Sequence, residues 1–95
     1  RDRLLAEVPG ALAAKVGALG RRHSPPEVRE LVWQLCRIRA WKAEEFATLL
    51  VRTADHVRAE YLRPLLDAGR IVPTRPDKPN DPQQAYEAAY TADEL

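Results

Sequence analysis

The tetrapeptide Ser-Pro-Pro-Glu at residues 24–27 constrains the fold most, because it fixes where the first long helix begins. Proline suits the first turn of a helix, and serine followed three residues later by glutamate forms a capping box. We therefore expect Ser24 to cap this helix and Glu27 to complete the box. Apolar residues recur at helical spacing from Val28 to Cys36, which predicts an amphipathic helix that ends near residue 38 or 39.

Two shorter helices are expected next. Residues 43–51 place their large apolar side chains at helical spacing, and residues 55–68 do the same up to Gly69, a typical helix terminator. Pro64 falls inside the second of these helices, where an interior proline costs about 3 kcal/mol, so we expect a bend there. The segment 40–42 is long enough only for a turn or a short bridging strand.

The C-terminal part predicts a small β-hairpin. Residues 70–74 form a strand-like segment, and Pro73 within it implies an edge position, because proline cannot donate a ladder hydrogen bond. A polar loop with three prolines covers residues 75–82. Residues 84–90 are expected to return as the partner strand, with Tyr86 pointing inward.

The N-terminal segment predicts an additional helix. Apolar residues at steps of four and three run through residues 4–19, and Pro9 divides this stripe. We expect a short arm, then a helix from Pro9 to Leu19 that stops at Gly20. The apolar stripe must be buried on this domain or on a second copy, which leaves homodimerisation open.

The order of these elements is that of a winged helix. A chain of 95 residues is expected to form one domain. We predict a mainly α fold with a small β-hairpin, a winged helix-turn-helix with an extra N-terminal helix. Residues 1–23 form the helical extension, 24–90 the winged-helix domain and 91–95 a flexible tail.

Composition and charge narrow the function classes. Residues 1–42 carry nine basic and four acidic residues, residues 43–80 six of each, and residues 81–95 four acids without a base. The basic N-terminal half suits an anionic partner. One cysteine, Cys36, excludes an internal disulfide and favours a cytoplasmic setting. No segment is long and apolar enough for a membrane span, so no membrane partner is expected.

The winged-helix order predicts a nucleic-acid-binding module for double-stranded DNA, with the third helix in the major groove and the wing on phosphate. The candidate contacts lie in the turn before the third helix, on that helix and in the loop: Arg52, Thr53, His56, Arg58, Arg63, Arg75 and Lys78. Glu60 and Asp67 on the same helix repel phosphate. They favour the alternative, a protein-interaction or dimerisation domain without nucleic-acid contact. The sequence does not separate DNA from RNA.

Other polar residues have simpler interpretations. A second basic set offers a phosphate site at the side of the first helix: Arg21, Arg22, Arg37, Arg39 and Lys42. We favour the alternative, in which Arg37 and Arg39 solvate a helix C-terminus. Cys36 is expected to be a buried thiol and Trp41 a core residue. The pattern contains no nucleophile with a base, no glycine-rich phosphate loop and no metal-ligand spacing. We therefore expect no enzymatic activity, cofactor, metal or small-molecule ligand for this fragment.

A family resemblance adds to this interpretation. It rests on Leu35-Cys36, Trp41, Glu45-Phe46-Ala47, Leu49-Leu50, Tyr61-Leu62-Arg63-Pro64-Leu65, Gly69, and the loop from Pro76-Asp77-Lys78-Pro79-Asn80 to Gln84-Ala85-Tyr86. Over about residues 24–90, the chain resembles winged-helix domains at the C-termini of bacterial proteins with a Schlafen-type, AlbA-like ATP-binding domain. The resemblance implies a longer bacterial parent, a transcriptional regulator or helicase, whose remaining domains are partners of this one.

Overall fold

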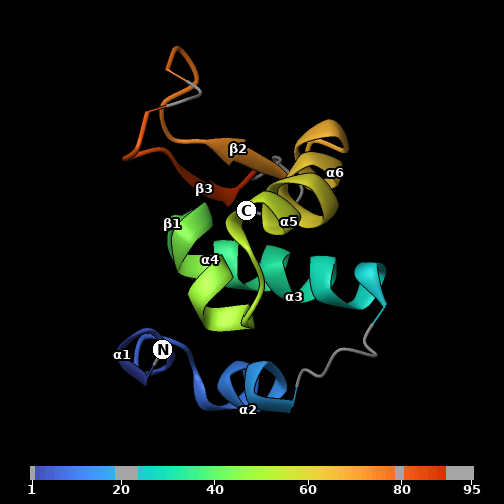
Figure 1. Cartoon of the computed structure of the whole chain (residues 1–95), viewed down its shortest axis with the longest axis vertical. Helices are drawn as coiled ribbons and strands as arrows, with labels where there is room; N and C mark the ends of the chain where they lie inside the picture. Colours follow the sequence, from blue (N-terminus) through green and yellow to red (C-terminus); the bar gives the residue numbers. More distant parts are fainter. Residues whose placement is uncertain (1, 19–23, 79–80, 90–95) are drawn as a thin grey trace.

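The computed structural model describes residues 2–18, 24–78 and 81–89 (Figure 1). In chain order, the elements are α1 (Asp2–Leu5), α2 (Gly10–Ala18), α3 (Pro25–Cys36), β1 (Trp41–Lys42), α4 (Ala43–Leu50), α5 (Ala54–Val57), the π-helical turn η1 (Arg58–Leu62), α6 (Arg63–Asp67), β2 (Ile71–Pro73) and β3 (Ala85–Ala88). Helices α3 and α4 form the middle of the molecule. Figure 1 shows α1 and α2 along one side of them, and the sheet with α5 and α6 on the other.

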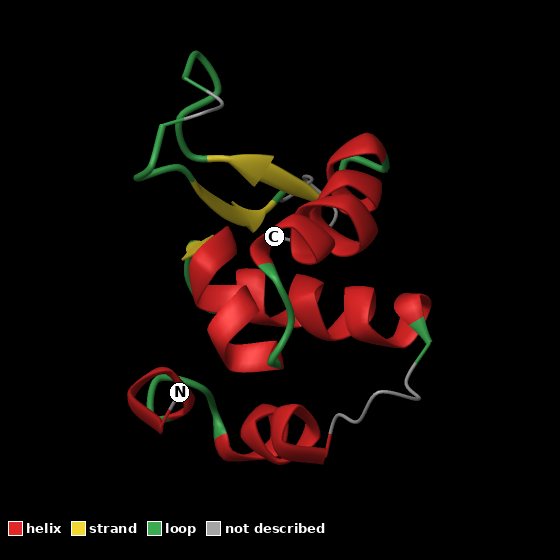
Figure 2. Cartoon of the chain, viewed as in Figure 1, coloured by secondary structure: helices red, strands yellow, loops and turns green. Residues whose placement is uncertain are grey.

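The sheet is antiparallel and has the strand order β1-β3-β2. β3 lies in the centre, with Trp41 of β1 opposite Tyr86 and Ile71 of β2 opposite Ala88. Figure 2 shows the loop between β2 and β3 projecting beyond the helices. The prediction of a mainly helical fold with a small hairpin is confirmed, and the order is compatible with a winged-helix layout. We call β2, β3 and the loop 74–84 the wing.

Three details of the sheet differ from or refine the expectation. The sheet has three strands, because the bridging segment at β1 pairs with β3. Pro73 lies on the edge strand β2, as predicted. Tyr86 is half-buried against the core, whereas the fully buried residue of β3 is Ala88. Tyr86 and Ala88 are two residues apart and therefore face the same side of the strand, toward the core, as expected for Tyr86, whereas Glu87 between them is exposed.

The start of α3 shows that prolines can replace a cap. Ser24 occupies the N-cap position, but its side chain makes no capping hydrogen bond, so the predicted capping box is wrong. Pro25 and Pro26 follow it and have no backbone N–H, which removes two of the donors that a cap would satisfy. The helix ends at Cys36, two or three residues before the predicted end, because residues 37–39 form a turn closed by backbone hydrogen bonds.

The third-helix segment, residues 54–67, is continuous but changes geometry at η1. In an α-helix, the ring of Pro64 would clash with the carbonyl of Glu60. The π turn widens the helix here, and the N–H of Arg63 bonds the carbonyl of Arg58. Because Pro64 has no N–H to offer it, the Glu60 carbonyl accepts a hydrogen bond from Arg29 Nη1 at 3.3 Å. The predicted bend is therefore a π turn whose unpaired carbonyl is satisfied from α3.

The N-terminal extension packs against the core of the same chain, so a second copy is not needed to bury its described apolar residues. Val8 and Val16 are buried in the main core, and Leu4 and Leu12 pack against it half-buried. The short arm contains a helical turn, α1, and α2 begins at Gly10 directly after Pro9. The expected end at Leu19 and the stop at Gly20 lie outside the described residues.

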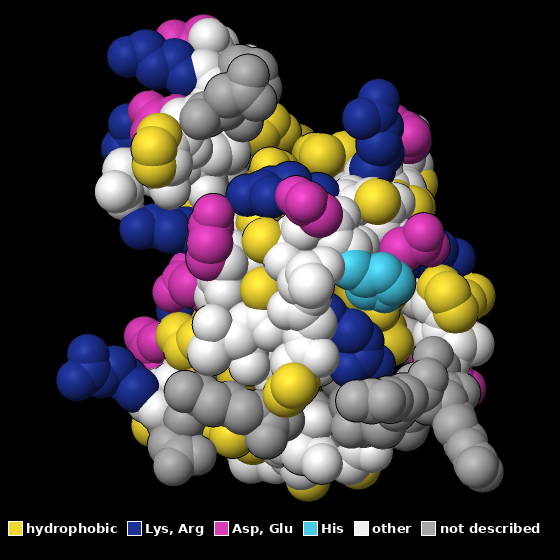
Figure 3. All heavy atoms as spheres, in the orientation of Figure 1, with side chains coloured by type: hydrophobic (Ala, Val, Ile, Leu, Met, Phe, Trp, Pro, Cys, Tyr) yellow, Lys and Arg dark blue, Asp and Glu magenta, His cyan; other side chains and the backbone are white. Residues whose placement is uncertain are grey.

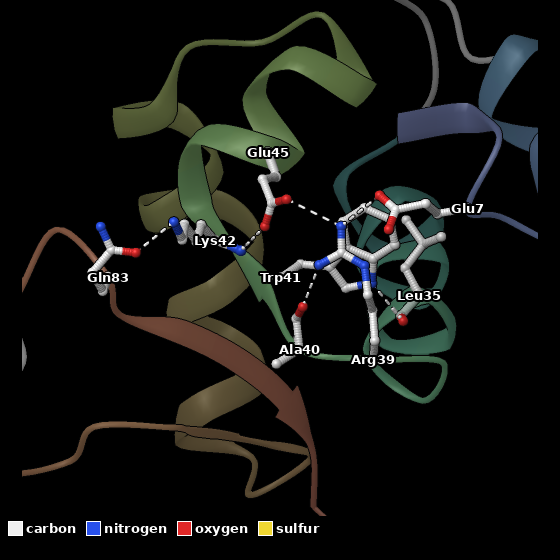
Figure 4. A network of polar contacts seen from close by, with 8 residues as sticks. All are labelled: Glu7, Leu35, Arg39, Ala40, Trp41, Lys42, Glu45 and Gln83. Atoms are coloured by element: carbon white, nitrogen blue, oxygen red, sulfur yellow. Dashed lines mark hydrogen bonds and ion pairs between the residues drawn. The ribbon is translucent and has the colours of Figure 1, made fainter. Parts of the chain in front are cut away.

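The guanidinium of Arg39 joins the extension to the core (Figure 4). Its Nη2 atom lies 3.0 Å from Glu7 Oε2, before α2, and 3.0 Å from Glu45 Oε2, in the first turn of α4. Its Nη1 atom donates to the carbonyl of Ala40 at 2.6 Å. The Cζ atom of Arg39 lies 3.6 Å from the ring centre of Trp41, a cation–π distance. One side chain therefore holds three parts of the chain together.

Glu45 makes the stability of the fold depend on pH. Burial alone would raise the pKa of Glu45, but hydrogen bonds from the Arg39 side chain and the Lys42 backbone, with their charges, lower it on balance. The unfolded value is about 4.3. Because the pKa of Glu45 is lower in the folded chain, the ionised carboxylate stabilises the fold at pH values above the unfolded pKa. This stabilisation is lost as pH falls through the folded pKa.

We expect Glu45→Gln to be less stable than the original chain near neutral pH and the difference to shrink in acid. Urea unfolding at about pH 6 and about pH 2.5 measures both differences. Glu44→Gln, a more exposed neighbour in the same turn, is the control. A difference that stays constant across this pH range would contradict the role of the Arg39–Glu45 pair.

The turn after α4 contains a strained residue. Val51 has φ 56° and ψ 53°, the left-handed conformation, and its side chain is 68% exposed. For a β-branched residue this conformation costs about 1–2 kcal/mol. Gly69 ends α6 in the same conformation, with φ 73°, where glycine has no such cost.

We expect Val51→Gly to raise the free energy of unfolding by about 0.5–1 kcal/mol, because the strain removed exceeds the added entropy of the unfolded chain. Gly69→Ala is the opposite case. No atom lies within 4 Å of the added Cβ, so no clash is expected. The left-handed backbone conformation alone should therefore lower the free energy of unfolding by about 1 kcal/mol. Urea unfolding compares the two, and a loss of stability in Val51→Gly would contradict the strain.

Candidate nucleic-acid interface

The third-helix segment leaves one face open to solvent. Ala59, Glu60, Arg63 and Asp67 are exposed on it, as the helical pattern predicts, whereas Val57, Tyr61, Leu62 and Leu65 are buried. The exposed face therefore alternates between acidic, basic and small side chains. Figure 3 shows basic and acidic side chains interspersed over the viewed side of the molecule, with no large area of one sign.

The turn before the segment is built from two of the candidate residues. Thr53 is the N-cap of α5, and its Oγ1 accepts a hydrogen bond from the N–H of His56 at 3.1 Å. Arg52 Nη1 donates to the Leu50 carbonyl at 2.7 Å, where α4 ends. Both side chains therefore stabilise helix ends.

His56 lies on the exposed side of α5 and contacts a buried aromatic residue. Its Nε2 atom is 3.2 Å from the hydroxyl of Tyr61, and the two rings meet edge to face at 5.3 Å. The sequence leaves two roles open for His56, a DNA contact or a cap of the third helix. The cap is made by Thr53, and the imidazole packs edge to face on Tyr61.

Arg58 is engaged by two carboxylates. Its Nη2 atom lies 3.1 Å from Glu44 Oε1 of α4, and its Nη1 atom lies 3.4 Å from Asp55 Oδ1. The Arg58 side chain is 47% exposed, and exposed ion pairs contribute at most about 1 kcal/mol. A phosphate can therefore compete with these carboxylates for the guanidinium.

The wing loop is organised by Gln84, whose side chain is buried. Its Oε1 atom accepts from the Arg75 N–H at 2.8 Å, and its Nε2 atom donates to the carbonyls of Arg75 at 2.6 Å and Lys78 at 3.2 Å. One amide thus closes the loop. The Arg75 side chain pairs with Asp81 at 3.3 Å, and the Lys78 side chain is exposed.

Two candidate cations are unengaged. Within residues 2–18, 24–78 and 81–89, the guanidinium of Arg63 and the ammonium of Lys78 have no ion-pair or hydrogen-bond partner. The five candidate bases nevertheless share this surface with six acids: Glu44, Asp55, Glu60, Asp67, Asp77 and Asp81. The surface therefore has no excess of positive charge.

The third-helix segment and the wing adjoin. A hollow of about 420 Å³ between them is lined by Arg58 from η1, Glu44 at the start of α4, and Asp81, Gln84 and Tyr86 from the wing. Sequence reasoning missed Glu44 and Gln84 here. The Glu44–Arg58 pair joins residues fourteen apart, so no local spacing predicts it.

A match between the sequence of this chain and a protein-family model identifies its family. The model for the C-terminal domain of the filamentation induced by cAMP protein Fic-like matches residues 26–88. The chain belongs to this Fic-like C-terminal domain family. No curated protein matches the chain, and no solved structure does.

The Fic-like C-terminal domain match runs from the first turn of α3 to the end of β3. It therefore includes the third-helix segment and the wing, and helices α1 and α2 lie outside it. The family description supports the helical C-terminal domain implied by the resemblance. Among the described residues, no helix has the length and apolar character needed to cross a membrane, and no group of three His, Cys, Asp or Glu residues is placed to hold a metal ion.

The second basic set is dispersed in the Fic-like domain. Arg37 lies 5.0 Å from the ring centre of Trp33, Arg39 forms the network described above, and Lys42 Nζ donates to Gln83 Oε1 at 2.7 Å. Arg21, Arg22 and His23 lie outside the described residues. The described members of this set do not form a common phosphate site.

Proposed function

We propose that this Fic-like C-terminal domain binds duplex DNA, with the third-helix segment in the major groove and the wing on the phosphates. The observation that carries this proposal is the adjacency of η1 and the wing at the hollow, together with the exposed and unengaged charges of Arg63 in α6 and Lys78 in the wing. In helix-turn-helix domains, such a helix contacts base edges while neighbouring segments contact the backbone.

The proposed mechanism uses exchange of ion partners. Phosphates first meet Arg63 and Lys78, which have no described partner to lose. Arg58 and Arg75 then exchange exposed carboxylates for phosphate oxygens, a replacement that costs little because such pairs are weak. The surrounding acids oppose binding at a distance, so the affinity should be modest and strongly salt-dependent.

We further propose that the domain works at the end of a longer bacterial protein with a Schlafen-type, AlbA-like ATP-binding domain, in the cytoplasm. The family description, a C-terminal domain, supports a position at the end of a longer protein, whereas the Schlafen-type parent rests on the resemblance of residues 24–90 alone. Burial and the charge of Glu87 raise the pKa of the Cys36 thiol to about 12, so this cysteine has little thiolate for exchange and suits a structural role.

A second candidate is a protein-interaction domain without nucleic-acid contact. The pairing of Arg58 with Glu44 and Asp55, and of Arg75 with Asp81, favours it, because these pairs give the surface no net attraction for phosphate. The two candidates predict opposite results in one binding experiment.

Fluorescence anisotropy of a labelled duplex between about 50 and 200 mM salt is that experiment. We expect micromolar binding at the lower salt that weakens steeply as salt rises. Arg63→Gln should weaken binding several-fold and reduce the slope of log K against log salt by about one. Arg3→Gln, on the exposed surface of α1 at the other side of the molecule, is the control and should change neither.

Absence of binding at about 50 mM salt would overturn the DNA proposal and favour the protein-interaction candidate. An equal loss of affinity in Arg63→Gln and Arg3→Gln would also contradict it, because net charge rather than the third helix would then drive binding.

A further inference from the structure

A groove separates the first turns of α3 from α6, and its lining residues are all different from those of the hollow beside the wing. It has a volume of about 320 Å³, and its lining includes Pro26, Arg29, Pro64, Leu65, Ala68 and Arg70. The two arginines come from different elements, and prolines and aliphatic side chains supply most of the remaining lining. The groove thus combines an apolar floor with two guanidinium groups.

Both guanidinium groups are held in place by the fold. Arg29 donates one N–H to the Glu60 carbonyl at the π turn. The Cζ atom of Arg70 lies over Trp33, 4.1 Å from the ring centre, and the guanidinium pairs with Glu30 at 3.0 Å. A guanidinium has five N–H donors, so each arginine keeps most of them for another acceptor. Preorganised arginines of this kind bind carboxylates and phosphates well.

The charges and the floor favour a peptide over a nucleic acid. Arg37 lies 5.0 Å and Arg70 4.1 Å from the ring centre of Trp33, so guanidinium groups compete with any base for stacking on this ring. Glu30 belongs to the lining, where its carboxylate can accept a peptide N–H, whereas a phosphate backbone offers it no N–H donor. Leu65 and the two prolines suit an apolar side chain.

We infer that the α3–α6 groove binds an extended acidic peptide segment of a partner protein, with carboxylates on Arg29 and Arg70 and an apolar side chain over Leu65. This inference does not depend on DNA binding by the third-helix segment. It assigns a separate protein contact to the face formed by α3 and α6.

NMR with nitrogen-15-labelled protein tests the inference, because the chain has two indole N–H groups with different environments. Trp33 underlies Arg70 at the groove, whereas Trp41 is fully buried and bonds the Leu35 carbonyl. The probe is a capped decapeptide containing four Glu and two Leu residues, and its matched control carries Gln in place of each Glu. We expect the acidic peptide to shift the Trp33 indole signal saturably and to leave the Trp41 signal in place.

Arg29→Gln and Arg70→Gln should each weaken peptide binding by about tenfold, the effect of losing a charge-assisted hydrogen bond. Arg3→Gln is the control and should bind the peptide normally. Circular dichroism confirms that each variant is folded, and Arg70→Lys, which keeps the charge, should retain part of the affinity.

Three results would overturn the inference. One is no Trp33 shift at millimolar acidic peptide. Another is equal binding of the Gln-substituted peptide. The last is a duplex oligonucleotide that shifts Trp33 and loses affinity in Arg29→Gln and Arg70→Gln, which would assign the groove to nucleic acid.

Discussion

Deleting residues 1–18 should lower the free energy of unfolding by about 3–5 kcal/mol, although these residues lie outside the family match. Val8 and Val16 are buried in the main core, with exposed fractions of 7% and 0%. Full burial of a valine is worth about 1.5 kcal/mol or more. The deletion also removes Glu7 from Arg39 and uncovers α3 and α4.

Urea unfolding followed by circular dichroism measures the loss, and two point variants isolate its main cause. Val16→Ala should cost about 1–2.5 kcal/mol because it leaves a cavity, whereas Lys15→Ala, its exposed neighbour, should stay within about 0.5 kcal/mol. An unchanged free energy of unfolding in the deletion would show that α1 and α2 are an attached linker rather than part of the core.

Trp41→Ala should lower the free energy of unfolding by about 3–5 kcal/mol, the cost of truncating a buried aromatic residue. The ring is fully buried and lies 6.0 Å from the Phe46 ring, and its Nε1 donates to the Leu35 carbonyl at 2.8 Å. The centre of the Trp41 ring also lies 3.6 Å from the Cζ atom of Arg39. The substitution therefore removes core contacts and the support of the Arg39 network together.

Trp41→Phe separates these contributions. It keeps an aromatic ring near Phe46 and removes the indole hydrogen bond to the Leu35 carbonyl, which still accepts the Ile38 N–H at 3.0 Å, so this hydrogen bond should account for only about 0.5–1.5 kcal/mol. Unfolding in urea, followed by circular dichroism, compares the two variants. A loss below about 1 kcal/mol in Trp41→Ala would contradict the placement of this ring in the core.

Much of the fold follows from local sequence signals. The helix start after Ser24, the bend at Pro64, the stop at Gly69 and the edge position of Pro73 each rest on the geometry of one or two residues. The structure agrees with the helix start, the stop and the edge position, and before Pro64 it contains a π turn. Where several weak signals compete, as at the end of α3, the prediction runs two or three residues too far.

The parts that sequence could not predict are contacts between distant residues. Arg29 satisfies the Glu60 carbonyl across 31 residues, and Arg39 reaches Glu7 across 32. Such pairs depend on how helices pack, which periodicity does not specify. For the same reason, the balanced charge of residues 43–80 does not show which bases are paired, since Arg58 and Arg75 meet their carboxylate partners only in the folded chain.

Contact of the third-helix segment and the wing with DNA can be tested by a nitrogen-15 NMR titration of the 95-residue chain with an unlabelled duplex at about 50 mM salt. We expect shifts at the backbone amides of residues 54–67 and 75–78, with the signals of α1 and α2 unchanged. Arg63→Gln with Lys78→Gln should suppress those shifts. Shifts confined to other elements, or no shift at millimolar duplex, would show that these two segments do not bind DNA.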